Sequence, residues 1–325
     1  ALRNMSLTRG FGRVVLVCGH GSRSANNPYA SSLDCGACGG HAGDVNARLA
    51  AETANDPLVR VRLAAQGIDI PDDTWFVAGL HETTTDQVAL LDLDLVPDSH
   101  RQEVARLQSA LDAAAAAARR ERAQRFGQAV ATVDRDTTRR TVDVSEVRPE
   151  WGLANNAALI VAPRWRTAGL NLAGRTFLHD YVHEDDTSLA VLTLILTAPM
   201  VVATWINLHY YASRLDPERY GSGNKVLHNV TSGLGVVEGN AGDLRVGLPW
   251  QSIHDGRQFR HEPRRLTVFV EAPQESIDTV LGQHPEVLAL VENEWLHLLA
   301  ISGDTVSRRH RHGWSEFTAL AHANT

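Results

Sequence analysis

The chain has 325 residues, of which 43% are hydrophobic and 21% are charged, and its formal net charge is −7. This composition is typical of a globular protein with enough chain for one large domain or two ordinary ones. The acidic balance argues against a general nucleic-acid binder, because such a protein needs a clustered basic face to neutralise phosphates.

The predicted elements alternate between strands and helices. The apolar run at 13–18 is typical of a buried strand, and a Gly-, Ser- and Asn-rich loop is expected over 19–44. The later elements are helices at 45–54 and 57–66 with Gly67 as a stop, a strand at 74–80, a helix-rich stretch at 99–126, a polar irregular segment at 128–150, a strand at 156–162, loops at 221–243, a strand at 266–271, a helix at 273–282 and a strand at 296–301. This order predicts an α/β fold with a mostly parallel sheet flanked by helices, and with additional helical insertions.

One stretch is strongly apolar. From Thr187 to Ser213 there is no Asp, Glu, Lys or Arg, and this length could span a bilayer. Pro199 lies near its middle, which favours a buried helix pair broken before the proline. A membrane span, or a surface that packs on a membrane subunit, remains an alternative.

The residues that could carry chemistry gather near the start of the chain. Three cysteines and two histidines lie within 24 residues and are flanked by glycines: Cys18, His20, Cys35, Cys38 and His41. Zinc favours thiolate and imidazole ligands, and glycines let the backbone turn tightly around an ion. A low, odd cysteine count does not indicate a disulfide framework, but metal or thiol chemistry in a reducing compartment.

Three interpretations of this cluster are open. The first is a structural zinc site of Cys35 and Cys38 with His20 and either Cys18 or His41. The second is a catalytic zinc held by His20 and Cys35, with its other ligands elsewhere. The third is a set of buried cysteines and a hydrogen-bonded histidine without metal.

Several neighbouring residues have weaker signals. Asp34 could orient His20 or cap the loop, and Cys38 could be a spare ligand or a small buried residue. His81 ends the second predicted strand, where ligand crevices form in α/β sheets, so it could relay protons, shape a pocket or be structural.

Three further motifs are interpreted as having no catalytic role. His179 and His183 are spaced as on one helix face, but their acidic neighbours indicate a solvated surface. The segment 308–312 is expected to be a mobile basic end. The turn at 220–225 lacks the spacing of a phosphate-binding loop.

Long motifs resemble one family, in order and over most of the chain to about residue 280. These motifs are Gly19–Arg48, His81–Asp86, Glu146–Ala154, Thr197–Met200, Trp205–Leu208, Tyr220–Lys225, Leu227–Val230, Gly247–Ser252 and His261–Pro263. Together they are similar to the C-terminal portion of the bacterial inorganic carbon transporter subunit DabA family.

The resemblance implies a β-carbonic-anhydrase-like zinc centre. The family's shell has two cysteines, one histidine and one aspartate, and the histidine and second cysteine match His20 and Cys35. The first cysteine, the aspartate and an arginine come from a Cys-x-Asp-x-Arg motif that is absent from this sequence, so no catalytic residue is assigned. Asp34, Cys38 and His81 would lie around the ligands. The chain is then expected to be a fragment that holds half of the zinc shell and is inactive alone.

The resemblance also implies an organisation and partners. Residues 1–98 would be part of the carbonic-anhydrase-like zinc domain, 99–150 a helix-rich insertion and 151–325 a C-terminal α/β region. The complete protein would hydrate CO2 to bicarbonate at the cytoplasmic face of the inner membrane. Its partner would be a membrane-embedded proton-conducting subunit similar to those of complex I. The alternative function is a non-catalytic scaffold with a structural zinc site of His20, Cys35, Cys38 and His41.

Overall fold

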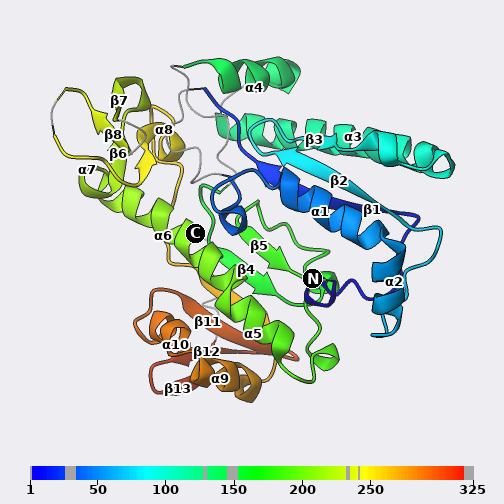
Figure 1. Cartoon of the computed structure of the whole chain (residues 1–325). Coiled ribbons are helices and arrows are strands. Elements are labelled where there is room, and N and C mark those ends of the chain that lie inside the picture. Colours follow the sequence, from blue (N-terminus) through cyan, green and yellow to red (C-terminus); the bar gives the residue numbers. More distant parts are fainter. Residues whose placement is uncertain are drawn as a thin grey trace. The chain divides into compact units, whose positions relative to one another are not determined.

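The computed structural model describes residues 2–25, 34–126, 130–144, 153–231, 235–240 and 242–317. The chain folds into two compact units, each assembled from separate stretches of sequence. The first comprises Ala1–Ser6, Leu153–Asp216 and Arg260–Thr325, and the second comprises Leu7–Gly152 and Pro217–Phe259. Figure 1 shows their elements coloured along the sequence.

The second unit contains a three-stranded sheet in the order β1-β2-β3, with β1 and β2 parallel and β3 antiparallel to β2. Helix α1 packs against β1 and β2, and α3 packs against β3 (Figure 1). The elements are β1 (Val14–Gly21), α1 (Asp44–Asn55), α2 (Pro57–Ala64), β2 (Trp75–Glu82), β3 (Gln87–Leu90), α3 (Arg101–Phe126) and α4 (Val133–Val142).

Local sequence signals explain several boundaries in this unit. Helix α2 begins at Pro57, and the Asp56 carboxylate caps it by accepting hydrogen bonds from the N–H groups of Leu58 and Val59 at 2.7 and 3.1 Å. Gly67, expected as the stop, has a φ of +80°, in the left-handed region that ends many helices. The two predicted helices at 45–54 and 57–66 are therefore confirmed to within two residues.

A small lobe completes the second unit. Its elements are α7 (Pro217–Tyr220), β6 (Gly221–Gly223), β7 (His228–Thr231), β8 (Gly235–Glu238), β9 (Leu248–Pro249) and α8 (Trp250–Ile253). The prediction of loops over 221–243 was wrong, because β7 and β8 form an antiparallel hairpin and β6 pairs with β9. Lys225, the single lysine of the sequence, is only 3% exposed here.

The first unit contains a six-stranded sheet in the order β13-β12-β11-β10-β4-β5. The four strands from β11 to β5 are parallel, and β12 and β13 extend the sheet as an antiparallel hairpin. The elements are β4 (Ala158–Val161), β5 (Thr176–His179), α5 (Ala190–Thr197), α6 (Pro199–Leu215), β10 (Thr267–Glu271), α9 (Gln274–Gln283), α10 (Pro285–Glu292), β11 (His297–Ser302), β12 (Thr305–His310) and β13 (Gly313–Glu316). The protein is thus a mixed α/β protein whose largest sheet is mostly parallel.

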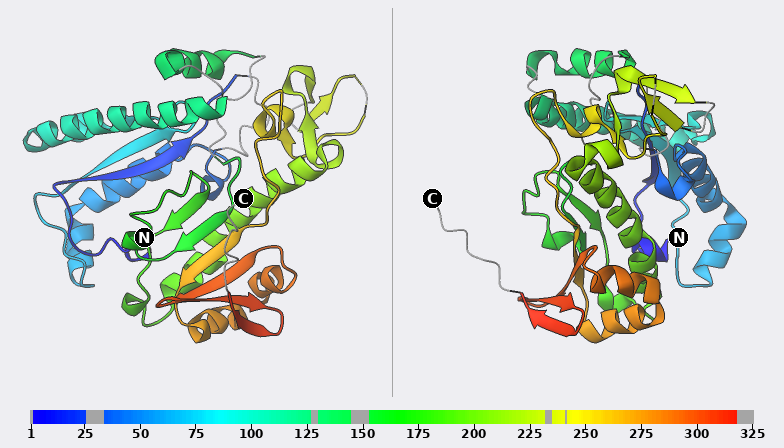
Figure 2. Two further views of the ribbon diagram at one scale, coloured as in Figure 1. Left: turned by 180° about the vertical axis from the view of Figure 1, so that it is seen from behind. Right: turned by 90° about the vertical axis from the view of Figure 1, so that its left-hand side faces the viewer.

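One hydrophobic core joins the helices of this unit to its sheet. Side chains of α5, α6, α9 and α10 pack with those of β4, β10 and β11 in a single cluster. Seen from behind, the strands lie in front of α5 and α6 (Figure 2). The predicted break before Pro199 is confirmed, since α5 ends at Thr197 and α6 begins at the proline.

The apolar helix pair is only partly buried. By length and composition, Ala190–Leu215 could cross a membrane, but the core helix of a soluble protein passes the same test. One face contributes Leu192, Ile195 and Met200 to the core, each 0% exposed. Trp205, in contrast, is 63% exposed.

Two predictions for polar segments were wrong. Part of the segment expected to be irregular, 128–150, forms helix α4, which packs on α3. The expected mobile end at 308–312 instead belongs mostly to β12, where Arg309 donates to the Asp278 carboxylate at 2.8 Å. Trp314 of β13 donates to the same carboxylate at 2.8 Å, so this hairpin is tied to α9.

Candidate functional site

His20 and His81 are paired at the carboxyl ends of β1 and β2. In the register of the two strands, His20 lies opposite His81 and Gly21 lies opposite Glu82. Both histidines were expected just beyond a strand end, but both are the penultimate residues of longer strands. Side chains alternate between the faces of a sheet, and register partners in parallel strands share a face, so the two imidazoles project from the same side.

Helix α3 covers the face that carries the two histidines. Val14, six residues before His20 and therefore on its face, packs with Val77 of β2 and Val104 of α3. Residues farther along α3 can therefore contact this face of the sheet.

On the other face, two glycines bring the start of α1 against β1. A Cβ atom on Gly19 would lie 2.2 Å from the carbonyl oxygen of Gly43. The Gly43 N–H donates to the His20 carbonyl at 2.8 Å. Only glycine at position 19 permits this close approach. The contact holds the segment that precedes α1 at the end of β1.

The Cys-x-x-Cys segment forms a closed turn next to this contact. The Cys35 N–H donates to the His41 carbonyl at 3.1 Å, and the Cys38 N–H donates to the Cys35 carbonyl at 3.0 Å. Gly39 and Gly40 have φ values of +67° and +79°, which favour glycine. Because Gly43 is bound to β1 two residues after His41, the turn is held near the carboxyl end of the strand.

The residues around this turn have defined hydrogen bonds. Asp34 Oδ1 accepts from the N–H of Ser22 at 2.8 Å, so this carboxylate caps the chain just after β1. The Cys38 Sγ atom accepts from the side-chain amide of Asn46, in α1, at 3.1 Å. Cys18 is exposed, and desolvation raises the pKa of its thiol, opposed by a hydrogen bond to the His81 backbone.

An ion-pair network orients His81. Its Nε2 atom lies 3.2 Å from Asp86 Oδ1, and Arg122 of α3 donates to the same oxygen at 2.9 Å. A carboxylate can only accept, so Nε2 carries a proton and donates it, and in the neutral ring Nδ1 would carry the lone pair. Arg122 also donates to the Thr83 carbonyl at 2.8 Å, which fixes the turn between β2 and β3.

The turn from Glu82 to Asp86 is polar, and Thr84, Thr85 and Asp86 within it are buried. Thr84 is 0% exposed and donates to Glu82 Oε1 at 2.9 Å, and that oxygen also accepts from the Arg23 N–H at 2.6 Å. Asp86 is 7% exposed, and within the described residues its Oδ2 atom has no hydrogen-bond partner. A buried carboxylate oxygen in this state is suited to a donor supplied by a water molecule or ligand.

The structure does not assemble a complete metal site. Across the described ranges, no three His, Cys, Asp or Glu side chains are grouped so that they could hold an ion. His20 and Cys35 have the donor types of a zinc ligand, but they amount to half of a tetrahedral shell. His179 and His183 do not share a helix face, because His179 ends β5 and His183 begins a 3₁₀ turn.

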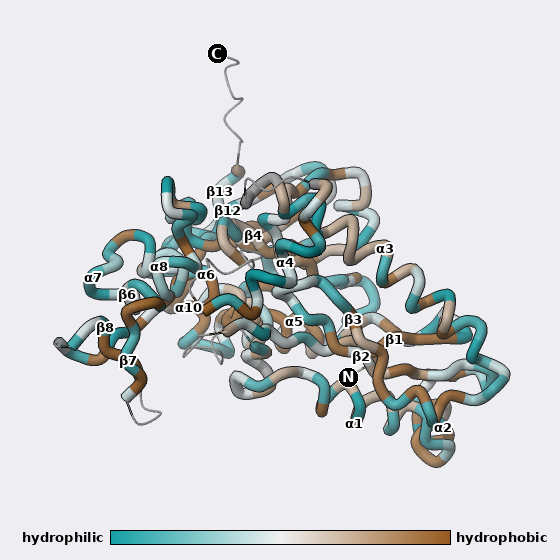
Figure 3. The backbone as a smooth tube through the Cα atoms, turned by 90° about the horizontal axis from the view of Figure 1, so that it is seen from above, coloured by the Kyte–Doolittle hydropathy of each residue, from teal (hydrophilic) through white to brown (hydrophobic). Residues whose placement is uncertain are grey.

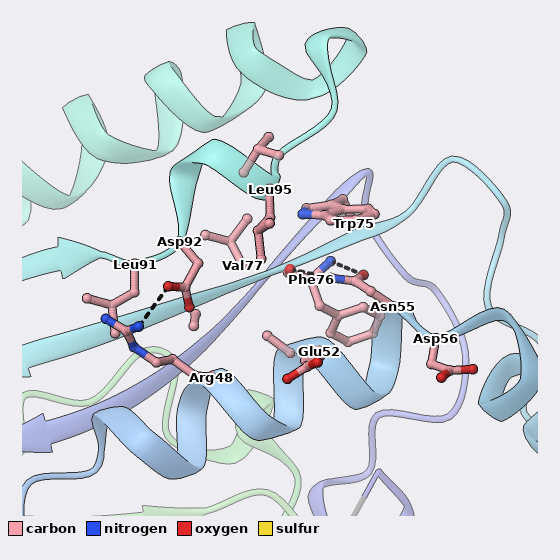
Figure 4. Close-up of a pocket in the computed structure, with 13 residues that line it drawn as sticks. Arg48, Glu52, Asn55, Asp56, Trp75, Phe76, Val77, Leu91, Asp92 and Leu95 are labelled. Atoms are coloured by element: carbon pink, nitrogen blue, oxygen red, sulfur yellow. Dashed lines mark hydrogen bonds and ion pairs between the residues drawn. The ribbon is translucent and has the colours of Figure 1, made fainter.

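A separate pocket of about 350 Å³ opens beside the amino-terminal half of β2 (Figure 4). It is lined by apolar side chains such as Trp75 and Leu95, and by the Arg48–Asp92 ion pair at 2.8 Å. Ligands of parallel α/β sheets bind beyond the carboxyl ends of the strands. The chemistry is therefore better placed at His20 and His81, at the other end of β2.

Sequence reasoning missed the partners of His81. Asp86 appeared only as the end of a motif, and Arg122 only as part of the helix-rich stretch predicted at 99–126. The separation of Arg122 and Asp86 along the sequence gives no signal of their contact, because this contact depends on how α3 packs. Two stretches that carried motifs or loop predictions, 26–33 and 145–152, lie outside the described residues.

The fold and the site define a mixed α/β protein with a histidine- and cysteine-bearing site at the carboxyl ends of parallel strands. The family described as "Probable inorganic carbon transporter subunit DabA" matches residues 1–296. The chain belongs to this family.

Curated relatives carry the same description. The sequence is 55% identical over 302 residues to the relative from Chloroflexus aurantiacus strain J-10-fl, covering 93% of this chain and 36% of that protein. It is 56% identical over 302 residues to one from Bradyrhizobium sp. strain BTAi1, with coverages of 93% and 36%. For Xanthomonas euvesicatoria the identity is 55% over 303 residues, with coverages of 93% and 37%. The chain spans a little more than a third of the length of these relatives, and no solved structure matches it.

Proposed function

We propose that this chain supplies half of a zinc shell, His20 and Cys35, to a protein that takes up inorganic carbon by carbonic-anhydrase-like hydration of CO2. The observation that carries the proposal is the pairing of His20 with His81 at the carboxyl ends of parallel strands, beside the Cys35 turn. The names of the relatives support the inorganic carbon part of the proposal.

The donor set suits zinc. Cysteine thiolate and neutral imidazole are its usual protein ligands, and two of them leave two positions for ligands from outside these residues. When bound, zinc lowers the pKa of a coordinated water to about 7, which makes hydroxide available at neutral pH.

The residues of this chain position the site. The Gly19–Gly43 contact fixes the Cys35 turn against the strand that carries His20. Asp86 and Arg122 hold the His81 ring beside His20 with its Nδ1 lone pair free of that network. His81 is then placed to accept a hydrogen bond from a water molecule or bicarbonate in the site, and Asp86 Oδ2 can accept another.

The proposed location is peripheral, on the cytoplasmic face of the inner membrane. The support is the helix pair α5–α6, which carries no charged residue from Thr187 to Ser213 although Trp205 and Leu194 are exposed. A helix on the surface of a soluble protein normally presents charged residues to water. We propose that this face contacts a membrane-embedded proton-conducting subunit that resembles those of complex I.

Metal analysis of the full-length protein purified with its membrane partner tests the zinc shell. The Cys35→Ser variant should lose bound zinc, measured by mass spectrometry of the metal. The Cys38→Ser variant is the matched control and should keep zinc, because the Cys38 sulfur already accepts from Asn46. Loss of zinc in both variants would favour the structural site of His20, Cys35, Cys38 and His41, and a wild-type protein without zinc would refute both.

A further inference from the structure

Cys35 and Cys38 are the two ends of one hydrogen-bonded turn. The Cys38 N–H donates to the Cys35 carbonyl at 3.0 Å, across the 3₁₀ turn Gly36–Cys38. Residues i and i+3 of such a turn have Cα atoms about 6 Å apart. A disulfide needs a Cα separation of about 4.4–6.8 Å, so the backbone already places these two cysteines at bridging distance.

Backbone hydrogen bonds hold this turn without help from a metal. The Cys35 N–H donates to the His41 carbonyl at 3.1 Å, and the Gly40 N–H donates to the Cys35 carbonyl at 3.1 Å. The left-handed φ values of Gly39 and Gly40 let the chain reverse within these few residues. A bond between the two sulfur atoms therefore requires rotation of two side chains but no new backbone fold.

Both thiols are reduced and lie within reach of small solutes. Cys35 and Cys38 are half-buried, and Gly36 and Gly39 of the same turn are exposed. The two sulfur atoms differ in their surroundings, because Cys38 Sγ accepts from the Asn46 amide at 3.1 Å whereas Cys35 is a ligand of the proposed zinc shell. A thiol outside the shell, three residues from a thiolate within it, is placed as the second cysteine of a redox-sensitive pair.

We propose that Cys35 and Cys38 form a reversible disulfide that releases zinc from the site, with a low-molecular-weight disulfide such as glutathione disulfide as the oxidant. The release of zinc rests on the proposed function. The disulfide itself depends only on the geometry of the turn and on the two thiols, and it holds whether or not Cys35 binds a metal.

The exchange balances in two steps. The Cys38 sulfur bonds to one sulfur of glutathione disulfide, whose S–S bond breaks, and the Cys38 proton leaves with the first glutathione as a thiol. The Cys35 thiolate then attacks the Cys38 sulfur of this mixed disulfide, which forms the Cys35–Cys38 bond and releases the second glutathione as a thiolate. Two electrons pass from the cysteines to glutathione. Zinc loses a ligand, because Cys35 changes from an anionic thiolate to a neutral disulfide sulfur.

Cys18 provides a comparison within the same chain. It is exposed and lies in β1, a strand that is hydrophobic along much of its length (Figure 3). Its Sγ atom donates to the Gly19 carbonyl at 3.4 Å, so its thiol is tied to the strand and not to the turn. Exposure alone would make Cys18 the first thiol to be oxidised, whereas the turn geometry selects Cys35 and Cys38.

Treatment of the full-length protein and its membrane partner with glutathione disulfide tests the proposal. The peptide that contains Cys35 and Cys38 should become lighter by two hydrogen atoms, the protein should lose its zinc, and dithiothreitol with added zinc should restore it. Cys38→Ser should keep its zinc under the same oxidant, and Cys18→Ser should respond as the wild type does. Glutathione that stays attached to Cys38, or equal loss of zinc from Cys38→Ser and the wild type, would overturn the proposal.

Protein stripped of metal by a chelator separates this inference from the zinc shell. There the same disulfide should form at least as fast, because no metal occupies the Cys35 sulfur. A wild-type protein that binds no zinc but forms the disulfide would refute the proposed function and the release of zinc, and would support the disulfide. Absence of the Cys35–Cys38 bond from both the zinc-loaded and the metal-free protein would refute this inference and leave the zinc shell standing.

Discussion

The Nε2 atom of His81 lies 3.2 Å from Oδ1 of Asp86, and this contact joins the end of β2 to the turn that follows it. Asp86 is 7% exposed and has a φ of +61°, in the left-handed region that few residues other than Gly, Asn and Asp occupy. Its side chain is held by Arg122 from a distant helix. A left-handed backbone conformation and a buried ion pair thus coincide beside the proposed zinc site.

Asp86→Asn should lower the free energy of unfolding by about 2–4 kcal/mol, because Arg122 loses its carboxylate partner in a largely buried setting. Asp86→Ala should cost about 1 kcal/mol more, since alanine is disfavoured at positive φ and asparagine is tolerated. Chemical denaturation of both variants measures the two effects. If both unfold at the wild-type denaturant concentration, the network does not stabilise the turn.

Gly19→Ala should destabilise the protein by about 2–4 kcal/mol and separate α1 from the end of β1, because a methyl group there overlaps Gly43. Gly12→Ala is the matched control, since its nearest neighbour would lie at an ordinary 3.5 Å. Thermal unfolding of the two variants compares them directly. Equal stability of the two variants would mean that β1 and Gly43 can move apart without cost.

Trp205→Glu should release the protein from membranes that contain its partner subunit, because it places a charge in the middle of the uncharged α5–α6 face. Trp165→Glu is the control on the same unit, as Trp165 is 67% exposed but lies outside that face. Membrane flotation of the full-length protein reads out both variants. Release by both, or by neither, would show that the α5–α6 face is not the contact.

His261 should make the protein sensitive to acid between about pH 6.5 and pH 4. Its Nδ1 accepts from the Asn155 N–H at 2.8 Å, and burial, assisted by Arg175 and Arg214, lowers its pKa to about 4. The unfolded chain binds this proton at higher pH than the folded one. Stability from neutral His261 is therefore fully present above pH 6.5 and is lost as the pH falls toward 4, by about 3 kcal/mol in total.

The His261→Asn variant isolates this effect. Its side-chain oxygen can replace Nδ1 as acceptor but does not titrate. Unfolding measured from pH 7 to pH 4 should be flatter for the variant than for the wild type. A wild-type curve with the same slope as the variant would show that His261 does not control the acid sensitivity.

Most of the elements that rest on local patterns were predicted correctly. The strands predicted at β1, β2, β4 and β10 and the break before Pro199 are confirmed. These features depend on short runs of apolar side chains and on the missing N–H of proline, both of which act within a few residues. The apolar α5–α6 pair was also recognisable, since composition alone shows the lack of charge.

Elements made of polar residues were missed for a common reason. Arg309 in β12 is stabilised by Asp278, 31 positions away, and helix α4 is stabilised by contacts with α3. A charged segment that pairs with distant groups has the same local pattern as a solvated end. Its structure is decided by tertiary contacts that no short window contains.

By itself, the sequence determined the family, and it singled out His20 and Cys35 as the candidate zinc ligands. Only the tertiary structure decided that His20 lies in register with His81 and that Asp86 and Arg122 orient that ring. Register depends on the pairing of strands more than fifty residues apart, and the Asp86–Arg122 contact depends on the packing of α3. Neither leaves a local trace in the chain, because both arise only when distant segments come into contact.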